Sequence, residues 1–313
     1  MTSEVIVRKQ GAPYRSVMNT TTATTAPRPV GALFREWRER RRLSQMRLAL
    51  DAGVSTRHLS FLETGKARPS REMVERLADR LDVPLRERNT LLLAAGFAPA
   101  YPEHDLDAPT LGAARRVVDR LLAGHEPYPA LAIDRHWTLL AANRAVAPLL
   151  AGVSPELLRP PVNVLRLSLH PAGLAPRIAN LAQWRAHLLE RLRRQVEVTA
   201  DATLAALAAE LAAYPAPDAP GSDDPRSASA LTSTSAFAGI AVPLLLRAEG
   251  GMLAFLSTTT VFGTPVEVTL AELAVEAFFP ADAATAEALR HAAGAPGAPG
   301  AAGAPGAPNR TAE

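Results

Sequence analysis

The stretch from residue 43 to residue 69, LSQMRLALDAGVSTRHLSFLETGKARP, constrains the fold more than any other part of the chain. Its apolar residues recur at helical spacing on both sides of Gly53, which suits the turn between two short helices. Ser44 and Ser55 stand where each of these helices needs an N-terminal cap. The pattern predicts a helix-turn-helix whose second helix begins at Thr56.

The first two turns of this second helix expose side chains that can meet base edges in the major groove of DNA. They are Thr56, Arg57, His58, Ser60 and Phe61. The leucines at positions 59 and 62 already supply core contacts, so an exposed Arg and Phe on the same helix have no role in packing. The alternative is a helical hairpin that only packs, as many bundle proteins contain.

The charge of the chain is divided between its two parts. Residues 1–100 hold 18 Lys and Arg against 10 Asp and Glu, a net charge of +8, whereas residues 101–313 have a net charge of −5. The basic residues that flank the motif are Arg35, Arg38, Arg40, Arg41 and Arg42 before it and Lys66, Arg68 and Arg71 after it. Such positions border a groove-bound helix, so the charge favours a DNA-binding module joined to a domain of another kind.

The order and spacing of several short phrases point to one family. They are Leu43-Ser44-Gln45, Ala-Gly-Val-Ser at 52–55, Leu59-Ser60, Leu62-Glu63, Gly65 and Pro69. In these the chain resembles the lambda-repressor-like, or XRE-type, DNA-binding domains of bacteria. The resemblance implies that Gln45 holds a phosphate and braces the recognition helix, while Thr56, Arg57 and Ser60 face bases. Phe61 departs from the polar residue often found there, so we expect it to touch a thymine methyl or a sugar edge. The DNA-binding set is completed by His58, Lys66 and Arg68.

Domain boundaries follow from the periodicity and from composition. Residues 29–98 predict an all-α domain of five helices, and residues 99–110, which are polar and punctuated by Pro, predict a linker. Residues 1–28 and 293–313 cannot bury a core and are expected to be disordered. The sequence lacks a signal peptide, a membrane-spanning stretch and cysteine, which predicts a cytoplasmic protein without a membrane partner.

Residues 111–292 predict a second domain of the α+β class. Residues 129–153 change to a strand, a turn at Asp134, a second strand, and then Asn143, which we expect to cap a helix. Residues 239–280 contain three β-rich runs separated by glycine turns, so we expect an antiparallel sheet of about five strands with helices against it. The strand-turn-strand pattern within residues 129–153, followed by Asn143, is similar to the beginning of a PAS domain.

Two long phrases extend the resemblance over residues 30–291. They are STRHLSFLETGKARPSREMVERLADRLDVPLRERNTLLLAAGFAP and FLSTTTVFGTPVEVTLAELAVEAFFPADAATAEALR. The chain resembles the MmyB-like transcription regulators, which join an XRE-type domain to a PAS-like ligand-binding domain. The resemblance implies a one-component regulator that binds double-stranded operator DNA and takes up a small apolar effector, such as a fatty acid, in its C-terminal domain. We expect it to act as a homodimer, with ligand entry changing the placement of the two recognition helices.

Candidates for the ligand pocket come from strands and helices that would face a cavity of the PAS-like sheet. They are Trp137, Leu139, Trp184, Leu188, Phe255 and Ser257, with Arg185 or His187 available to pair with a carboxylate head group. For each of the first six residues a place in an ordinary core is the alternative, and for Arg185 and His187 the alternative is a position that faces water.

Two other classes of protein compete with this interpretation. The sequence contains no GxSxG, HExxH, P-loop or GxGxxG motif, and its seven His residues lack metal-ligand spacing, so we expect neither an enzyme nor a cofactor or metal. The remaining alternative is an antitoxin-like or adaptor protein with the same DNA-binding domain, whose C-terminal part binds a protein. An extended apolar surface would favour that alternative.

Overall fold

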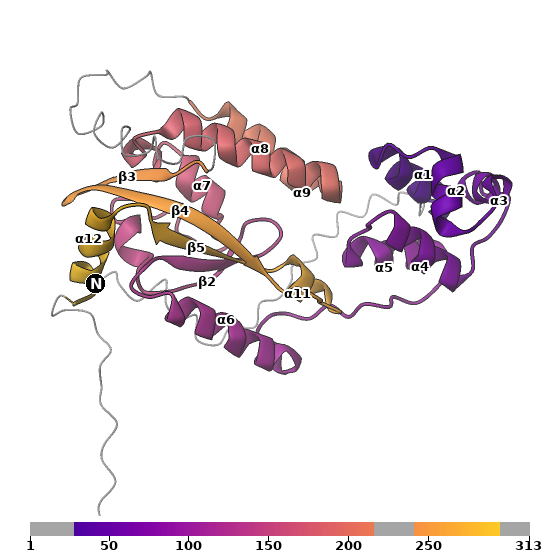
Figure 1. Cartoon of the computed structure of the whole chain (residues 1–313), viewed down its shortest axis with the longest axis horizontal. Coiled ribbons are helices and arrows are strands. Elements are labelled where there is room, and N and C mark those ends of the chain that lie inside the picture. The colour runs from indigo at the N-terminus through magenta and orange to yellow at the C-terminus, as the bar shows by residue number, and fades with distance from the viewer. Residues whose placement is uncertain (1–27, 216–240, 295–313) are drawn as a thin grey trace, which may run out of the picture.

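The computed structural model describes residues 28–215 and 241–294, in which a helical part lies beside a part built on a sheet (Figure 1). The tails predicted to be disordered fall outside the described residues, except for Arg28 and the end of the last helix. In the described ranges, no helix is both long enough and apolar enough to cross a membrane.

The helical part has the predicted all-α fold. Its helices are α1 (Val30–Arg40), α2 (Gln45–Ala52), α3 (Thr56–Glu63), α4 (Arg71–Arg80) and α5 (Leu85–Ala94). One apolar cluster joins them, and Phe34, Leu48, Leu59, Leu77 and Leu92 are completely buried in it. Within a helix the buried residues lie three or four positions apart, as Leu33 and Phe34 do from Trp37 in α1, so the helix turns one apolar side toward the shared core.

The turn between α2 and α3 has the expected local chemistry. The Oγ atoms of Ser44 and Ser55 accept hydrogen bonds from the backbone N–H groups of Arg47 and His58, each at 3.1 Å, which confirms both predicted caps. Gly53 has a φ of 67°, a left-handed conformation that ends α2 and that L side chains rarely adopt. These three residues set the angle between the two helices.

The C-terminal part contains the predicted antiparallel sheet. Its strands are β1 (Ala130–Ile133), β2 (Leu139–Ala142), β3 (Leu244–Ala248), β4 (Gly251–Val261) and β5 (Ala274–Pro280). Their order in the sheet is β2-β1-β5-β4-β3, and every neighbouring pair is antiparallel. The first and last thirds of this domain therefore meet at the β1–β5 pair, where Ala130 faces Ala277.

Helices cover both faces of the sheet (Figure 1). They are α6 (Gly112–Gly124), α7 (Val164–Leu169), α8 (Leu181–Thr199), α9 (Ala202–Ala213), α11 (Val268–Glu272) and α12 (Ala283–Gly294), with short 3-10 helices η1 (Pro109–Leu111), η2 (Ala147–Leu150) and η3 (Ala175–Arg177). Helix α6 buries Val118 against Ala132 and Val275 of one face. Helices α8 and α9 bury a larger cluster with Ile133 and Phe255 of the other face.

Two expectations for this domain were wrong in detail. Asn143 does not cap a helix: its Oδ1 accepts from the N–H of Ala130, and its Nδ2 donates to the carbonyls of Leu122 and Tyr128. A buried amide is satisfied better by three backbone groups than by one helix end. The third β-rich run also begins with a helix, α11, before β5 starts at Ala274.

Helix α1 approaches the end of α3 so closely that Gly31 has no space for a side chain. A Cβ at Gly31 would lie 2.1 Å from the carbonyl oxygen of Leu62. We expect Gly31→Ala to destabilise the helical domain by about 1–3 kcal/mol, because backbone must shift to relieve the overlap. Amide hydrogen exchange of α1 and α3 in the full chain measures the loss.

Gly124→Ala is the matched control, because a Cβ at Gly124 would meet nothing within 4 Å. This change should leave exchange in α1 and α3 unaltered. Unaltered exchange in Gly31→Ala as well would show that α1 does not pack on α3 in this way.

Candidate nucleic-acid interface and ligand-binding core

Helix α3 turns one side into the core and leaves the other side to solvent. Leu59 and Leu62 are buried, whereas Thr56 and Arg57 are exposed and three further predicted contact residues are partly exposed. Those three are His58, Ser60 and Phe61. The residues proposed to face bases thus lie on the accessible side of α3.

Phe61 is the centre of a small aromatic and cationic cluster. The guanidinium carbon of Arg57 lies 5.3 Å from the centroid of the Phe61 ring, and the Nζ of Lys66 lies 5.9 Å from it. In the described part of the chain no ion pair occupies Arg57, Lys66 or Arg68. Their positive charge is therefore available to a nucleic acid.

A buried carboxylate fixes α3 against the two preceding helices. Glu63 accepts two hydrogen bonds from Arg38, from Nε at 2.6 Å and from Nη2 at 2.9 Å. The side chain of Glu63 is 1% exposed and that of Arg38 is 10% exposed. Gln45, at the first residue of α2, donates from Nε2 to the same carboxylate at 2.7 Å. This contact is consistent with the bracing role expected of Gln45, while its phosphate contact stays a prediction.

Two of the arginines expected to border the DNA groove have other roles. Arg38 is buried in the ion pair with Glu63, and Arg41 donates to the carbonyl oxygens of Leu81 and Asp82 at the end of α4. A helical run of arginines must turn some members inward, because successive residues point around the helix axis. The exposed members of the run are Arg35, Arg40 and Arg42.

Part of the predicted ligand pocket comes together in one buried cluster. Trp137, Trp184, Leu188 and Phe255 all belong to it and are at most 4% exposed. Leu139 and Ser257 are only half-buried and lie outside this cluster. The indole N–H groups of the tryptophans are satisfied by Gln195 Oε1 at 2.8 Å and by Ser168 Oγ at 3.0 Å.

The two candidates for a carboxylate contact differ in their surroundings. The Nη2 of Arg185 donates to the carbonyl oxygens of Leu211 and Ala212 at the end of α9. The ring of His187 is stacked on Trp184, with 5.5 Å between centroids, and burial lowers the pKa of this histidine. His187 therefore faces the apolar cluster more directly than Arg185 does.

A groove of about 470 Å³ runs along α8 beside this cluster. It is lined by His187, Glu190, Arg191, Arg194, Gln195, Val198 and Thr199. Arg191 covers the ring of Trp137, with the guanidinium carbon 4.5 Å from the centroid, and pairs with the buried carboxylate of Glu276. This pair was not predicted from the sequence. A charged residue inside the apolar strand β5 was the available signal, because a buried carboxylate needs a partner.

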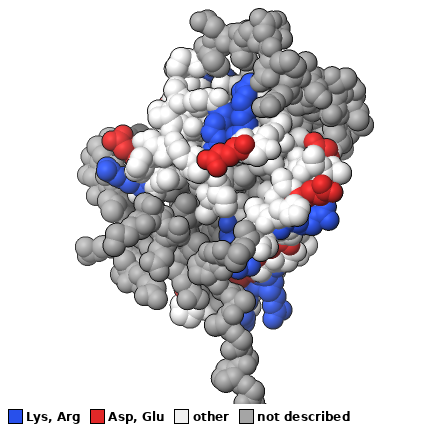
Figure 2. Space-filling view, turned by 90° about the vertical axis from the view of Figure 1, so that its left-hand side faces the viewer, with Lys and Arg blue, Asp and Glu red and all other residues white. Residues whose placement is uncertain are grey.

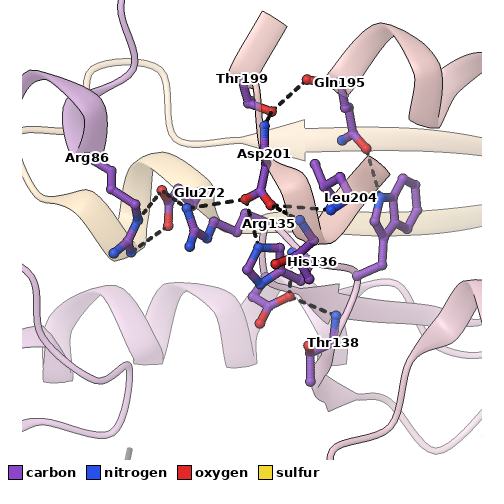
Figure 3. A network of polar contacts seen from close by, with 12 residues as sticks. Arg86, Arg135, His136, Thr138, Gln195, Thr199, Asp201, Leu204 and Glu272 are labelled. Carbon is purple, nitrogen blue, oxygen red and sulfur yellow. Dashed lines mark hydrogen bonds and ion pairs between the residues drawn. The ribbon is translucent and has the colours of Figure 1, made fainter. Parts of the chain in front are cut away.

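A polar network connects the two domains (Figure 3). Arg86 of α5 donates from Nε to Glu272 of α11 at 2.8 Å and from Nη1 to Glu103 at 2.8 Å. Hydrogen bonds to both carboxylates raise the pKa of Arg86. Arg135 lies 3.7 Å from Glu272 and 3.5 Å from Asp201, whose carboxylate also contacts His136 Nε2 at 2.8 Å. Sequence reasoning missed this network, because it joins residues that lie far apart in the chain.

Burial also affects the pKa values of two carboxylates at the junction between the domains. Burial alone would raise the pKa of Asp201, but His136 and two backbone N–H groups lower it, and the net pKa lies below its usual value. Burial raises the pKa of the neighbouring Glu87. On the face at the opposite end of the molecule, several of the visible basic side chains lie beside acidic ones (Figure 2).

Comparison with known proteins agrees with this division. A family model described as the MmyB-like transcription regulator ligand binding domain matches residues 114–292, more than half of the chain. The chain belongs to the MmyB-like transcription regulators. A second model, described as a helix-turn-helix domain, matches residues 29–91. This MmyB-like regulator therefore combines a DNA-binding helix-turn-helix with a ligand-binding domain.

Two individual proteins are also similar to this chain, but each comparison supports less than the family models do. The uncharacterized HTH-type transcriptional regulator RghRB of Bacillus subtilis (strain 168) is 36% identical over 81 residues, which are 26% of this chain. The match covers 56% of RghRB, so the MmyB-like chain spans about half the length of this curated relative. A solved RNA-binding light-oxygen-voltage receptor is 15% identical, with a TM-score of 0.21, and the match covers 91% of this chain and 67% of the receptor. Such a TM-score supports no structural conclusion.

The buried pair in this MmyB-like regulator predicts a large difference between two arginines of one helix. Arg38→Met leaves Glu63 buried without its cation, and we expect a loss of about 3–5 kcal/mol in the free energy of unfolding. Arg35→Met removes only an exposed pair with Glu39 and should change it by less than about 1 kcal/mol. Urea denaturation followed by circular dichroism measures both. Equal effects would show that Glu63 does not depend on Arg38.

Proposed function

We propose that this MmyB-like regulator binds operator DNA through α3, as a homodimer in the cytoplasm, and that a small apolar ligand in its C-terminal domain modulates this binding. DNA binding through α3 is supported by its accessible face, where Arg57 and Lys66, which pair with no carboxylate among the described residues, lie beside Phe61 while Glu63 anchors the buried side of the helix. A rigidly held helix can place its side chains reproducibly against bases.

We assign a role in DNA contact to each residue from its position on α3 or in the loop that follows α3. Arg57 lies on the exposed first turn of α3, where a guanidinium can bond a guanine edge in the major groove. Lys66 and Arg68 follow α3 in an exposed loop, so we assign them to phosphates together with Gln45. Thr56, His58 and Ser60 complete the contact to bases. A dimer would place two such helices in half-sites about one helical turn, or a multiple of it, apart.

The proposed ligand occupies the apolar cluster around Trp137, Trp184 and Phe255. Arg191 and Gln195 line the groove on α8 and also contact Trp137, so these two side chains separate the groove from the edge of this cluster. Arg191 is committed to Glu276, since leaving that carboxylate buried without a cation would be costly. The head group of an apolar acid would then lie between His187 and Arg194. Leu139 and Ser257 are more distant members of the predicted pocket.

Base readout and phosphate contact predict different mutant behaviour. On a duplex enriched from a random pool by the natural protein, Arg57→Ala should lose about 1–3 kcal/mol of binding free energy and relax preference at one base position. Lys66→Ala should weaken specific and random DNA alike and reduce the salt slope by about 1. Fluorescence anisotropy at several salt concentrations measures both. Equal loss on random and enriched DNA for Arg57→Ala would remove Arg57 from base readout.

Dodecanoate is a suitable probe for the ligand site, because it combines an apolar chain with a carboxylate. We expect calorimetry to show saturable binding that Arg194→Ala weakens, because Arg194 lines the groove. Arg115→Ala is the control, since Arg115 and its partners Asp107 and Asp119 all lie outside the groove lining. Arg185→Ala tests the other candidate for the head group. Absence of saturable binding would contradict an apolar acid as the ligand class.

A further inference from the structure

The segment that connects the two domains is fixed at both of its ends. On the side of the helical domain, Asn89 of α5 accepts from the N–H groups of Ala100 and Tyr101 and donates to the carbonyl of Tyr101. On the other side, the N–H of Val268 in α11 donates to the carbonyl of Pro102 at 2.9 Å. Only the peptide between Tyr101 and Pro102 separates the two anchors, so a small change at this point reorients one domain relative to the other.

Arg86 bridges the same point through side chains. Its guanidinium makes paired hydrogen bonds both to Glu272 of the C-terminal domain and to Glu103 of the connecting segment. The side chains of Arg86 and Glu272 are 26% and 19% exposed, respectively. Planar, paired contacts of this kind are sensitive to the relative orientation of the two groups. The docking of the helical domain therefore depends on where Glu272 is held.

The turn that joins β1 to β2 holds Glu272 in place. Arg135 of this turn lies between Glu272 and Asp201, and the adjacent His136 contacts Asp201 (Figure 3). Asp201 also begins α9, because its Oδ1 accepts from the N–H groups of Thr203 and Leu204. The preceding Thr199 and Ala200 line a polar cavity of about 90 Å³ together with residues of α1 and α5. Glu272, through Arg86, and the segment before Asp201, through this cavity, thus both contact the helical domain.

The next residue of the turn, Trp137, belongs to the buried cluster. Asp134 Oδ1 accepts from the N–H groups of His136 and Thr138, each at 2.8 Å, and this arrangement holds Trp137 at a φ of 65°. The side chain of Trp137 points into the core and its indole N–H donates to Gln195. Consecutive residues of one stiff turn therefore contact the domain interface and the apolar core.

We propose that this turn, residues 134–138, transmits the occupancy of the apolar core to the DNA-binding domain through Asp201, Arg135, Glu272 and Arg86. The inference rests on the proposed ligand site, because Trp137 is the part of the turn that an incoming ligand would displace. A displaced Trp137 moves its neighbours Arg135 and His136, since the turn is hydrogen-bonded as a unit. The partly exposed ion pairs of the network can exchange partners at small cost in free energy, which suits a contact that must re-form in a second arrangement.

Spin-label distance measurements on the full chain test this relay without any ligand. The chain contains no cysteine, so Arg76→Cys on α4 and Glu287→Cys on α12 provide two unique and exposed labelling sites. We expect a narrow distance distribution in the otherwise natural chain and a broad one in Arg86→Ala. Arg193→Ala is the control for the loss of an ion-paired arginine that does not bridge the domains, because both carboxylates that Arg193 pairs with lie in its own helix.

The link to the core is tested by a matched pair of tryptophan substitutions. Trp137→Phe and Trp184→Phe each keep an aromatic ring in the same cluster and each lose one indole hydrogen bond, but only Trp137 belongs to the turn. We expect Trp137→Phe to broaden the distribution toward that of Arg86→Ala, and Trp184→Phe to leave it narrow. Gln195→Ala removes the hydrogen-bond partner of the Trp137 indole without substituting any residue of the turn. If Trp137→Phe fails to fold, Gln195→Ala should broaden the distance distribution in its place.

Two results would overturn the relay. One is a narrow distribution in both Trp137→Phe and Gln195→Ala, and the other is equal broadening in Trp137→Phe and Trp184→Phe. Neither result would bear on the ligand or on DNA binding, which calorimetry and anisotropy measure separately. A failure of the proposed ligand would conversely leave these distance distributions unchanged.

Discussion

The ion pair between Arg38 and Glu63, joined by Gln45, is the interaction on which the DNA-binding surface depends. It lies where α1, α2 and α3 meet, and its members are the last turn of one helix, the first residue of the next and the last residue of the third. A buried carboxylate leaves its position only at a large cost in free energy. This contact, the close approach of Gly31, the apolar core and the turn at Gly53 together fix the orientation of α3, and with it the direction of Arg57 and Phe61.

Local chemistry made much of the fold predictable. Serine caps, the glycine turn and apolar periodicity depend on residues within a few positions of one another, and Ser44, Ser55 and Gly53 behave as their neighbours require. Burial of a charged residue depends instead on what packs against it. Helical spacing from Phe34 places Arg38, unlike Arg40, on the apolar side of α1, but nothing near it shows that Glu63 meets it there. Likewise, nothing near Asn143 shows that its amide meets three backbone groups from other segments. The apolar cluster was anticipated in part, since Trp137 and Phe255 come together while Leu139 does not.

The presence of the two domains could be predicted from the sequence, but the contacts that would couple them could not. Family membership establishes a helix-turn-helix and a ligand-binding domain in one chain. How one influences the other depends on contacts between residues that are up to 186 positions apart, such as Arg86 and Glu272. The turn around Trp137 is where these contacts and the apolar core meet. A ligand that binds both arrangements of the domains equally would shift nothing, so the turn must favour one arrangement when the core is filled.

The most direct test is the affinity of the full chain for its enriched duplex, measured with and without saturating dodecanoate. The proposed regulation predicts that dodecanoate changes the affinity of the natural protein several-fold, in one direction, and that Arg86→Ala binds the duplex but loses the response. Ligand and DNA binding would then be coupled through the domain junction. An affinity that is the same with and without dodecanoate in the natural protein would contradict this account.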